Sequence, residues 1–374
     1  MLNTKFPGIA RESTALGFGC MRLPTLPDGK INEPEAIAMI RHAIDSGVKY
    51  VDTAYPYHGG QSEVVLGKAL KDGYREKVIL TSKLPCWAVQ SHEDMMRLLD
   101  EQLERLQEDH LDFYLLHALD IDRYHKMQAL DFKAFYQDAL AQGKIRYTGF
   151  SFHDEKAAFL EILEDYPWQM CQVQMNILDE NNQATIEGIR RAGEKGIGVV
   201  IMEPLRGGLL ADPPKEVREK YAAFPVQRSP IEWAFRYLYT MPEIVTILSG
   251  MSNMEQVEDN LRIFAKASRE SLSAEEKQLY AQIRETYLQR MKTRCTGCEY
   301  CQPCPRGVAI PRIFQGYDRS LLRENGSFKE GYEKIVASEA DASRCVRCGK
   351  CEKACPQHLP IIRFLQEIRA AVTA

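Results

Sequence analysis

Short apolar runs alternate with amphipathic segments over roughly the first 265 residues of the chain. Stretches between the runs place apolar residues at helical spacing, such as PEAIAMIRHAIDSG and the serine-capped SHEDMMRLLDEQLERLQ. The runs are TALGFGCM, VKYVDTA, KVILTSK, LDFYLLH, IRYTGFS, MCQVQM, IGVVIM and EIVTILS. Eight such alternations predict a parallel sheet with crossover helices, and their number and length match a (β/α)₈ barrel of the α/β class. An open doubly wound sheet is the alternative, but we find no early G-x-G-x-x-G turn of the kind that fold carries.

The pattern changes after the eighth run. A charged helix is predicted over roughly 273–292, and the last segment contains two helical stretches, PRIFQGYDRSLLREN and PIIRFLQEIRAAV, with no clear strand. We therefore expect three parts: a barrel over 1–272, a connecting helix over 273–293, and a small α-helical domain over 294–374.

Composition narrows the class of protein. The chain has 374 residues, 45% hydrophobic and 27% charged, as expected for a globular protein with more than one domain. A net charge of −4 gives no basic footprint for nucleic acid. No apolar run approaches the roughly 18 residues that span a bilayer, and the first residues lack the apolar core of a signal peptide. We expect a cytoplasmic protein with no nucleic-acid partner and no membrane span.

Ionisable residues close three consecutive predicted strands. Asp52 follows VKYV, Lys83 follows VILTS and His117 follows LDFYLL, while Tyr57 lies on the loop after Asp52. The chemistry of a (β/α)₈ barrel lies at the C-terminal ends of its strands, so the fold would bring these four residues together.

These four residue types suit proton transfer to a carbonyl oxygen. A lysine ammonium close to a tyrosine favours the phenolate and lowers the phenol pKa from its usual value near 10. An aspartate can hold that lysine charged, and a histidine can hydrogen-bond the same substrate oxygen. Together they could protonate a carbonyl oxygen while a hydride arrives at its carbon.

The barrel segment resembles the aldo/keto reductase family from about residue 10 to residue 265. The resemblance is carried by DTAYPY, from Asp52 to Tyr57, by Ser62 and Glu63, by TSK ending at Lys83, and by LLH ending at His117. It implies a (β/α)₈ barrel that reduces carbonyls or oxidises alcohols with a nicotinamide cofactor. Tyr57 would be the acid/base, Lys83 and Asp52 the pair that tunes it, and His117 the group that orients the substrate.

The same resemblance implies contacts to NAD(P)H. Ser151 and Gln172 match residues that hold the nicotinamide carboxamide, although Phe152 stands where the family usually has Asn. The implied contacts to the pyrophosphate and adenosine are Pro204, Leu205, Arg206, Gly207, Gly208, Ser252, Gln256 and Asn260. Positions 251–256 contain no Arg or Lys to clamp a 2′-phosphate, so NAD and NADP both stay open.

Eight of the eleven cysteines fall in two short runs near the C-terminus. The first run is C-x₂-C-x₂-C-x₂-C and the second C-x₂-C-x₂-C-x₃-C, each followed by proline. A secreted disulfide framework would need an export signal and a small chain. Structural zinc sites usually pair two C-x₂-C elements, whereas the second run has the bacterial ferredoxin spacing for 4Fe–4S clusters. Of the remaining three, Cys20 and Cys171 lie in strand-like runs, where buried inert thiols are common, whereas Cys86 lies just beyond Lys83 and could line the mouth of the barrel.

Cross-ligation is expected between the runs, because the last cysteine of a ferredoxin run binds the other cluster. The two expected ligand sets are Cys295, Cys298, Cys301 and Cys355, and Cys345, Cys348, Cys351 and Cys304. The segment resembles a helical dicluster ferredoxin domain. From Lys292 onward, 14 Lys and Arg outnumber 9 Asp and Glu, which suits anionic clusters and equally suits an ordinary solvated or docking face.

The preferred hypothesis is an aldo/keto reductase-type oxidoreductase of small carbonyls or alcohols, coupled to electron transfer through two 4Fe–4S clusters and a redox partner protein. A hydride carries two electrons and each cluster accepts one. Either a flavin divides the pair, or the substrate accepts electrons stepwise, or the two halves exchange none. The alternatives are an electron-transfer subunit with a non-catalytic barrel, and a redox sensor whose clusters gate the barrel.

Overall fold

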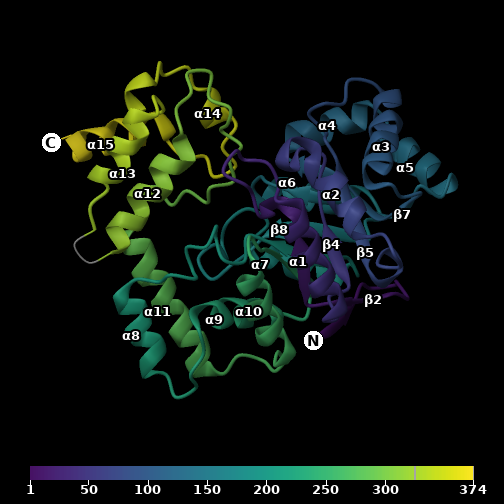
Figure 1. Ribbon diagram of the computed structural model, residues 1–374, viewed down its shortest axis with the longest axis horizontal. Helices are drawn as coiled ribbons and strands as arrows, with labels where there is room; N and C mark the ends of the chain where they lie inside the picture. Colours follow the sequence, from purple (N-terminus) through teal and green to yellow (C-terminus); the bar gives the residue numbers. More distant parts are fainter. Residues whose placement is uncertain (324–325, 374) are drawn as a thin grey trace. The chain divides into compact units, whose positions relative to one another are not determined.

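The computed structural model describes residues 1–323 and 326–373, which form two compact units. The barrel unit consists of Met1–Met175, Asp179–Pro204 and Phe235–Ser271. The cysteine-rich unit consists of Asn176–Leu178, Leu205–Ala234 and Leu272–Ala374. From the sequence, each part is expected to be one continuous stretch, with boundaries at 272 and 293, whereas the second unit also includes 176–178 and 205–234. Figure 1 shows the labelled helices and strands along the chain.

The predicted eight-stranded barrel is confirmed. Its strands are all parallel and close in the order β10-β3-β4-β5-β6-β7-β8-β9. Each coincides with one of the eight predicted apolar runs, and β5, β6, β7 and β10 extend one or two residues beyond theirs. Their bounds are β3 Leu16–Gly19, β4 Tyr50–Asp52, β5 Ile79–Leu84, β6 Leu111–Leu119, β7 Ile145–Phe152, β8 Met170–Gln174, β9 Gly198–Met202 and β10 Ile244–Gly250.

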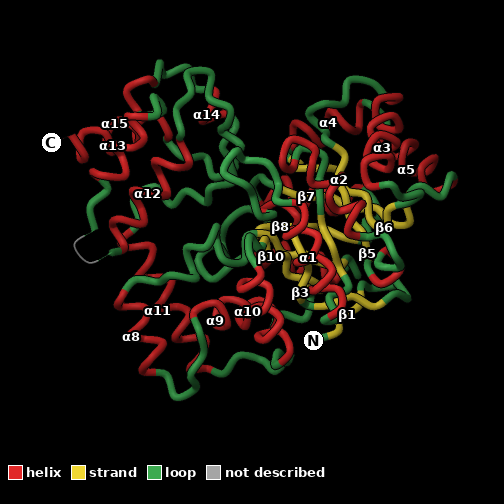
Figure 2. The backbone as a smooth tube through the Cα atoms, in the orientation of Figure 1, coloured by secondary structure: helices red, strands yellow, loops and turns green. Residues whose placement is uncertain are grey.

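Helices surround the strands, as Figure 2 shows in red around yellow. They are α1 Glu33–Asp45, α2 Gln61–Ala69, α3 His92–Leu106, α4 Ile121–Ala129, α5 Phe132–Ala141, α6 Lys156–Asp165, α7 Thr185–Glu194, α9 Pro230–Tyr239 and α10 Met254–Ala265. Ser91 caps α3 through a capping box with Asp94, as the serine at the start of that segment indicated. Every residue of β5 and β6 is buried, as is typical of parallel strands that are covered on both faces.

An N-terminal hairpin of β1 Asn3–Lys5 and β2 Glu12–Thr14 lies outside the closed barrel. Phe6, in the turn of the hairpin, packs into a core with Tyr50, Phe113 and Val200 from the barrel strands. A Cβ on Gly198 would lie 2.4 Å from the Phe6 ring, so only glycine fits there. Since Tyr50 and Gly198 begin their strands, this apolar core fills the N-terminal end of the barrel and leaves the C-terminal end for polar residues.

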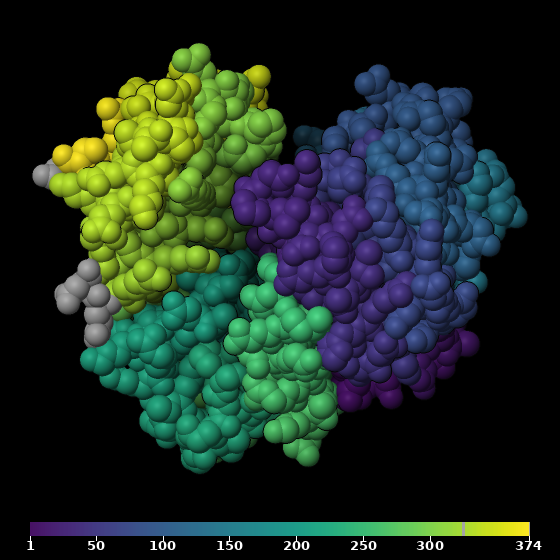
Figure 3. Space-filling view, viewed as in Figure 1, coloured from purple at the N-terminus to yellow at the C-terminus, as the bar shows by residue number. Residues whose placement is uncertain are grey.

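The cysteine-rich unit is helical, and none of its described residues lies in a strand. Its helices are α8 Lys215–Ala223, α11 Ala274–Arg290, α12 Ile310–Leu322, α13 Lys329–Ala337, α14 Lys350–Lys353 and α15 Ile361–Thr373. A core that includes Ile313, Phe314, Tyr332, Leu365 and Ile368 joins α12, α13 and α15, and five of the clustered cysteines pack against it. In Figure 3, the yellow residues near the C-terminus lie next to the yellow-green residues that precede them in the chain.

No helix within 1–323 or 326–373 is both long and apolar enough to cross a membrane.

Candidate functional site

Asp52 and Lys83 form a buried ion pair at the C-terminal end of the barrel strands. Asp52 is the last residue of β4, and Lys83 is the penultimate residue of the neighbouring β5. Lys83 Nζ lies 2.6 Å from Asp52 Oδ2 and donates a second hydrogen bond of 2.6 Å to the Thr53 carbonyl. The Lys83 side chain is fully buried, so its ammonium depends on these two acceptors.

Tyr57 and His117 lie beside this pair. Tyr57 begins the short helix η2 Tyr57–Gly60, and Lys83 Nζ lies 5.0 Å from the centroid of its ring. His117, in β6, meets the Tyr57 ring edge-on, with ring centroids 6.1 Å apart. Trp87 lies on the other side of His117 at 5.1 Å and is 45% exposed. The fold thus brings together the four residues that end or follow three strands.

Burial governs the protonation of this group. Burial, with the nearby Asp52 carboxylate, raises the pKa of Tyr57 well above its usual value. The expected lowering by Lys83 is not found, because the ammonium faces the ring and is paired with Asp52. Burial and the Lys83 charge lower the pKa of His117 well below its usual value. A neutral phenol and a neutral imidazole result, and both can donate a hydrogen bond to a carbonyl oxygen.

A buried polar network lies behind Lys83, and the sequence pointed only to its Glu63. Glu63 Oε1 accepts hydrogen bonds of 2.6 Å from both Ser82 and Gln102, and Arg105 lies 3.3 Å from its second oxygen. Gln102 also donates to the carbonyl of Lys83 at 3.1 Å. These bonds fix the backbone of β5 at Lys83. Gln102 lies on the core face of α3, and nothing in its sequence context distinguishes it from other helix residues.

Among the nicotinamide contacts implied for the barrel unit, Ser151 and Gln172 lie side by side on paired strands. Both are 2% exposed, and Ser151 Oγ accepts a hydrogen bond of 2.7 Å from the Ala118 amide. Gln172 Oε1 is buried and has no hydrogen-bond partner among the described residues. A buried amide oxygen without a partner is costly unless a bound group donates to it.

The residues implied for the adenosine end surround the start of α10. Gln256 Oε1 accepts from the Ser252 amide at 2.8 Å, and Asn260 donates to Ser249 at 2.9 Å. Ser252 Oγ donates to the carbonyl of Arg22 at 2.9 Å, and the Arg22 side chain lies beside Gly250. The exposed cation Arg22 thus lies beside the segment 251–256, which itself contains no Arg or Lys. Sequence reasoning missed Arg22 because it lies far earlier in the chain.

Pro204 ends a segment of the barrel unit, and the glycine-containing turn that follows belongs to the cysteine-rich unit. Arg206 is 3% exposed and donates hydrogen bonds to the Arg294 carbonyl at 2.5 Å and to Met291 Sδ at 3.5 Å. Arg319 donates to the Gly207 carbonyl at 3.0 Å. Gly207 and Gly208 both have positive φ, and no atom would lie within 4 Å of a Cβ on Gly208. Leu205 is half-buried.

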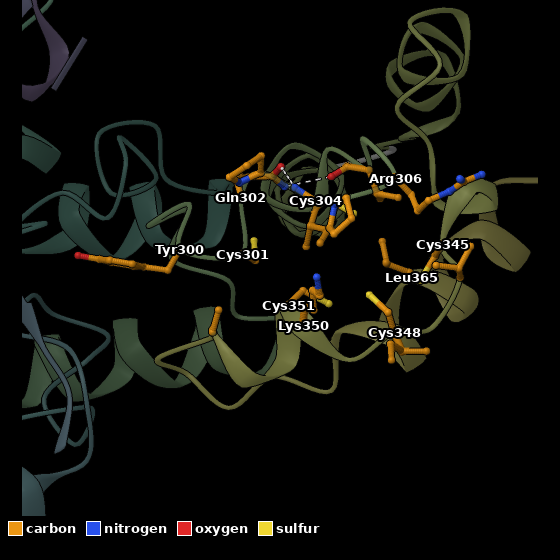
Figure 4. A pocket seen from close by; sticks show the side chains of 17 residues that line it. Tyr300, Cys301, Gln302, Cys304, Arg306, Cys345, Cys348, Lys350, Cys351 and Leu365 are labelled. Atoms are coloured by element: carbon orange, nitrogen blue, oxygen red, sulfur yellow. Dashed lines mark hydrogen bonds between the residues drawn. The ribbon is translucent and has the colours of Figure 1, made fainter. Parts of the chain in front are cut away.

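The eight clustered cysteines line two neighbouring cavities in the cysteine-rich unit. The larger cavity, of about 170 Å³, is lined by five of them, Cys301, Cys304, Cys345, Cys348 and Cys351. Figure 4 shows Cys304, Cys345, Cys348 and Cys351 around a common space, with Lys350 and Arg306 close by. The tighter cavity, of about 20 Å³, is lined by Cys295, Cys298, Cys301 and Cys355. Cys301 lines both cavities. Besides it, the larger cavity combines Cys304 with three cysteines of the second run, and the tighter cavity combines Cys355 with two cysteines of the first run.

The thiols of both cavities lie in apolar surroundings. Burial, and then the proximity of Cys298, raises the pKa of Cys301 to about 12. Burial, and then the Glu352 carboxylate, raises the pKa of Cys351 to about 11. In the described ranges, no three His, Cys, Asp or Glu side chains converge closely enough to hold one metal ion. The cysteines surround spaces, which suits a polynuclear cluster. The other three cysteines are buried, with raised thiol pKa values, as expected for inert residues.

Comparison with known families agrees with this geometry. The sequence profile of the aldo/keto reductase family matches residues 15–279, which is more than half of the chain. The chain belongs to the aldo/keto reductase family. A profile of a 4Fe-4S dicluster domain matches residues 294–360 and includes both cysteine runs. The chain is therefore an aldo/keto reductase-type oxidoreductase that carries an iron–sulfur dicluster domain.

Relatives of this aldo/keto reductase resemble it along the barrel. An L-galactose dehydrogenase from Arabidopsis thaliana is 28% identical over 291 residues, which cover 71% of this chain and 88% of the relative. The holo form of aldo-keto reductase AKR11C1 from Bacillus halodurans is 28% identical with a TM-score of 0.64, covering 76% of this chain and 96% of that one. An aldo-keto reductase from Klebsiella pneumoniae, solved in complex with NADPH, shares the fold at 23% identity, with a TM-score of 0.62 and coverage of 76% and 96%.

Proposed function

We propose that the chain interconverts small carbonyl compounds and alcohols with a nicotinamide cofactor, and that two 4Fe–4S clusters link this reaction to single-electron transfer. The observation that carries the proposal is the fully buried Lys83–Asp52 pair beside Tyr57 and His117 at the C-terminal end of the barrel. A buried ion pair of this kind seldom adds net stability, so its place at the catalytic end of the fold favours a catalytic role.

In carbonyl reduction, a nicotinamide supplies the hydride and the protein supplies the proton. The Tyr57 hydroxyl donates that proton to the carbonyl oxygen as negative charge develops on it. Lys83 stabilises the phenolate that remains, and Asp52 keeps Lys83 protonated and in position. The neutral imidazole of His117 donates a hydrogen bond to the same oxygen. In alcohol oxidation each of these steps runs in reverse.

The residues present fit a nicotinamide cofactor. Gln172 Oε1 is a buried acceptor with no partner within the described residues, and a carboxamide N–H can donate to it. Gly207 and Gly208 leave their backbone accessible to a pyrophosphate, because neither has a side chain and nothing lies near Gly208. Arg206 would contribute through its backbone only, since its guanidinium is already bonded within the cysteine-rich unit.

The residues present also fit two clusters. Both runs contribute cysteines to each cavity, and Cys304 and Cys355 each lie with three cysteines of the other run, which supports the ligand sets expected from cross-ligation. Hydride transfer between a nicotinamide and a carbonyl is balanced in itself. The clusters would take part in a separate half-reaction, in which one hydride of the reduced nicotinamide equals two electrons, one for each cluster, and one released proton. A flavin, or the substrate itself, would divide the electron pair into two single-electron steps.

Metal analysis tests the cluster half of this proposal. Anaerobic purification should yield about eight iron and eight sulfide per chain, whereas zinc without sulfide would overturn it. NADH or NADPH is then titrated into the protein while the visible absorbance of the clusters is followed. Bleaching by nicotinamide alone supports internal electron transfer, and binding without bleaching, even with added substrate, would disprove the coupling.

A conservative variant tests the barrel half. Tyr57→Phe removes only the hydroxyl, and carbonyl reduction should fall by about 10²-fold or more while cofactor binding persists. Tyr74→Phe is the matched control, because the Tyr74 hydroxyl bonds only Asp45 in an exposed pair. Full activity in Tyr57→Phe would rule out this residue as the acid.

A further inference from the structure

One of the two cysteine cavities opens to the surface more than the other. Cys348 is the only exposed cysteine among the eleven of the chain, all of which lie in the described ranges. It lines the larger cavity together with Cys304, Cys345 and Cys351. The tighter cavity contains the buried Cys355 and no exposed cysteine. A redox centre in the larger cavity would therefore lie nearer to an external electron carrier.

Exposed cations surround this open cavity. Arg306 and Lys350 line it, while Arg347 and Lys353 are sequence neighbours of the cysteines that do so. All four side chains are exposed, and none forms an ion pair with a carboxylate in 1–323 or 326–373. Their charges are therefore not neutralised by neighbours and act on an approaching molecule.

The acidic side chains near these cations are engaged elsewhere. Glu339 pairs with Arg344 at 3.2 Å. Glu352 is half-buried, and its Oε1 accepts a hydrogen bond of 2.9 Å from the Ile362 amide. The cations of this region, Arg306, Arg344, Arg347, Lys350 and Lys353, outnumber these two carboxylates. The positive charge is local, because the chain as a whole has a net charge of −4.

An apolar patch lies among the cations. Val346 is 58% exposed and lies between the ligand-run residues Cys345 and Arg347, while Pro303 and Pro305 are exposed on the other run. Small apolar contacts within a charged rim are typical of transient protein interfaces, in which charge guides the encounter and little area is buried.

We propose that Arg306, Val346, Arg347, Lys350 and Lys353, here named the basic face, dock an acidic one-electron carrier protein. The proposal rests on the proposed function, because it takes a 4Fe–4S cluster at Cys304, Cys345, Cys348 and Cys351 as the partner in the exchange. In each encounter the reduced carrier loses one electron and the centre in the larger cavity gains one. No bond forms and no proton moves in an encounter, and two encounters supply the two electrons that, together with one proton from solvent, equal one hydride.

The direct test measures electron transfer from a small acidic ferredoxin by stopped-flow absorbance at several salt concentrations. The variant is Lys350→Glu with Lys353→Glu, which reverses two charges on α14. The matched control, Lys329→Glu with Lys334→Glu, makes the same change on exposed residues of α13, neither of which lines the cavity. Binding of the ferredoxin is measured in parallel by its NMR chemical-shift changes.

We expect the wild-type rate constant to fall as salt rises, since opposite charges steer the encounter. At low salt the α14 variant should react at least tenfold more slowly and bind more weakly, with little salt dependence, while the α13 control should match the wild type. Photoreduced deazaflavin, a small uncharged reductant, should reduce all three proteins equally fast.

Three results would overturn the proposal. One is an unchanged rate in the α14 variant, and another is faster reaction of the wild type with a basic carrier. The third is an equal slowing with deazaflavin, which would place the effect on the centre itself. Iron and sulfide content is measured first in each protein. A chain without clusters contradicts the proposed function. A chain that contains its clusters, but whose electron-transfer rate depends neither on salt nor on the charge reversal, contradicts only the proposal that the basic face docks the carrier.

Discussion

The guanidinium of Arg206 donates a 2.5 Å hydrogen bond to the carbonyl of Arg294, which immediately precedes the first clustered cysteine. Arg206 follows β9 in sequence, in the turn implied to bind the cofactor pyrophosphate. Its neighbour Gly207 is held by Arg319 on α12. The proposed cofactor loop and the segment before Cys295 are thus parts of one hydrogen-bonded structure, and a change in one should be felt in the other.

Arg206→Met should reveal this link through stability and iron content. It leaves the Arg294 carbonyl without its charged donor, which should cost about 2 kcal/mol in the free energy of unfolding. We also expect less iron per chain after reconstitution. Urea unfolding followed by circular dichroism measures the first effect. Arg323→Met is the control, because that side chain is 71% exposed and its distance of 4.0 Å from Asp212 is at the outer limit of an ion pair. Equal midpoints for both variants would contradict the link.

Removing the partner of Lys83 should be costly. Asp52→Asn leaves a fully buried ammonium with neutral acceptors only, the amide oxygen and the Thr53 carbonyl. Loss of one partner in a buried pair typically destabilises a protein by about 3–5 kcal/mol. Carbonyl reduction should fall by about 10²-fold or more, because Lys83 would no longer be held charged beside Tyr57. Both effects are measured on the same preparation, by chemical unfolding and by steady-state kinetics.

An exposed pair provides the comparison. Asp72→Asn breaks the bond of 2.8 Å to Arg41, and Asp72 is 75% exposed. A pair of this kind contributes about 1 kcal/mol or less. If the Asp52 variant were as stable and active as this one, the buried pair would have no special role.

Buried histidines should make the protein less stable in mild acid. Burial, with the charge of Arg123, lowers the pKa of His153 to about 3, against about 6.5 for an unfolded chain. Between these values the unfolded state binds more protons, so stability is lost as pH falls from about 6.5 towards about 3. At pH 5 this single group should cost about 2 kcal/mol.

The His153→Gln variant isolates that contribution. Its loss of stability between pH 7 and pH 5 should be about 2 kcal/mol smaller than that of the wild type, because glutamine does not titrate. Urea unfolding at the two pH values measures the difference. Parallel pH profiles for the two proteins would mean that His153 is protonated in the folded state.

The sequence was sufficient for the barrel and for the four strand-end residues for a physical reason. Most residues of the barrel strands are buried, so each strand stands out as a largely apolar run, and a closed parallel barrel must gather the ends of its strands at one rim. Asp52, Lys83 and His117 could therefore be grouped without coordinates. The helix capped by Ser91 followed from local hydrogen bonding, which sequence also displays.

Contacts between distant segments could not be predicted in this way. Nothing around Arg206 indicates that its loop packs with residues near 294, or that 205–234 belongs to the cysteine-rich unit. The raised pKa of Tyr57 was also missed, because it depends on burial and on which atoms Lys83 faces. Arg22 and Gln102 acquire their places only through tertiary packing.

Arg22 should influence which nicotinamide nucleotide binds. Its exposed side chain lies beside Gly250, and its carbonyl accepts a hydrogen bond from Ser252, in the segment implied for the adenosine phosphate. Arg22→Ala should weaken NADPH binding by about tenfold, the value of one lost charge-assisted hydrogen bond, and change NADH binding little. Fluorescence titration measures both affinities. Arg262→Ala, on the exposed face of α10, is the control. Equal losses for NADH and NADPH would exclude contact with a 2′-phosphate.

Asp318 should determine whether the first cysteine run can hold its cluster. Its carboxylate is 2% exposed and accepts hydrogen bonds of 2.7–2.9 Å from the amides of 292–294 and from the Thr293 hydroxyl. The Thr293 hydroxyl in turn accepts from the Cys295 amide at 3.2 Å. An uncharged amide has only one acceptor oxygen, so Asp318→Asn turns an N–H₂ group towards donors that need an acceptor.

The expected loss in Asp318→Asn is about 3 kcal/mol of unfolding free energy, together with retention of about four irons per chain instead of about eight. Iron and sulfide analysis after anaerobic reconstitution measures the second effect. Asp341→Asn is the matched control, because Asp341 caps the short helix η4 Ala342–Arg344 before the second run through the Ser343 amide, and asparagine caps equally well. Retention of all the iron in Asp318→Asn would show that Cys295 is positioned without this carboxylate. Equal iron loss in both variants would mean that the two cavities assemble together and depend on the fold of the unit as a whole.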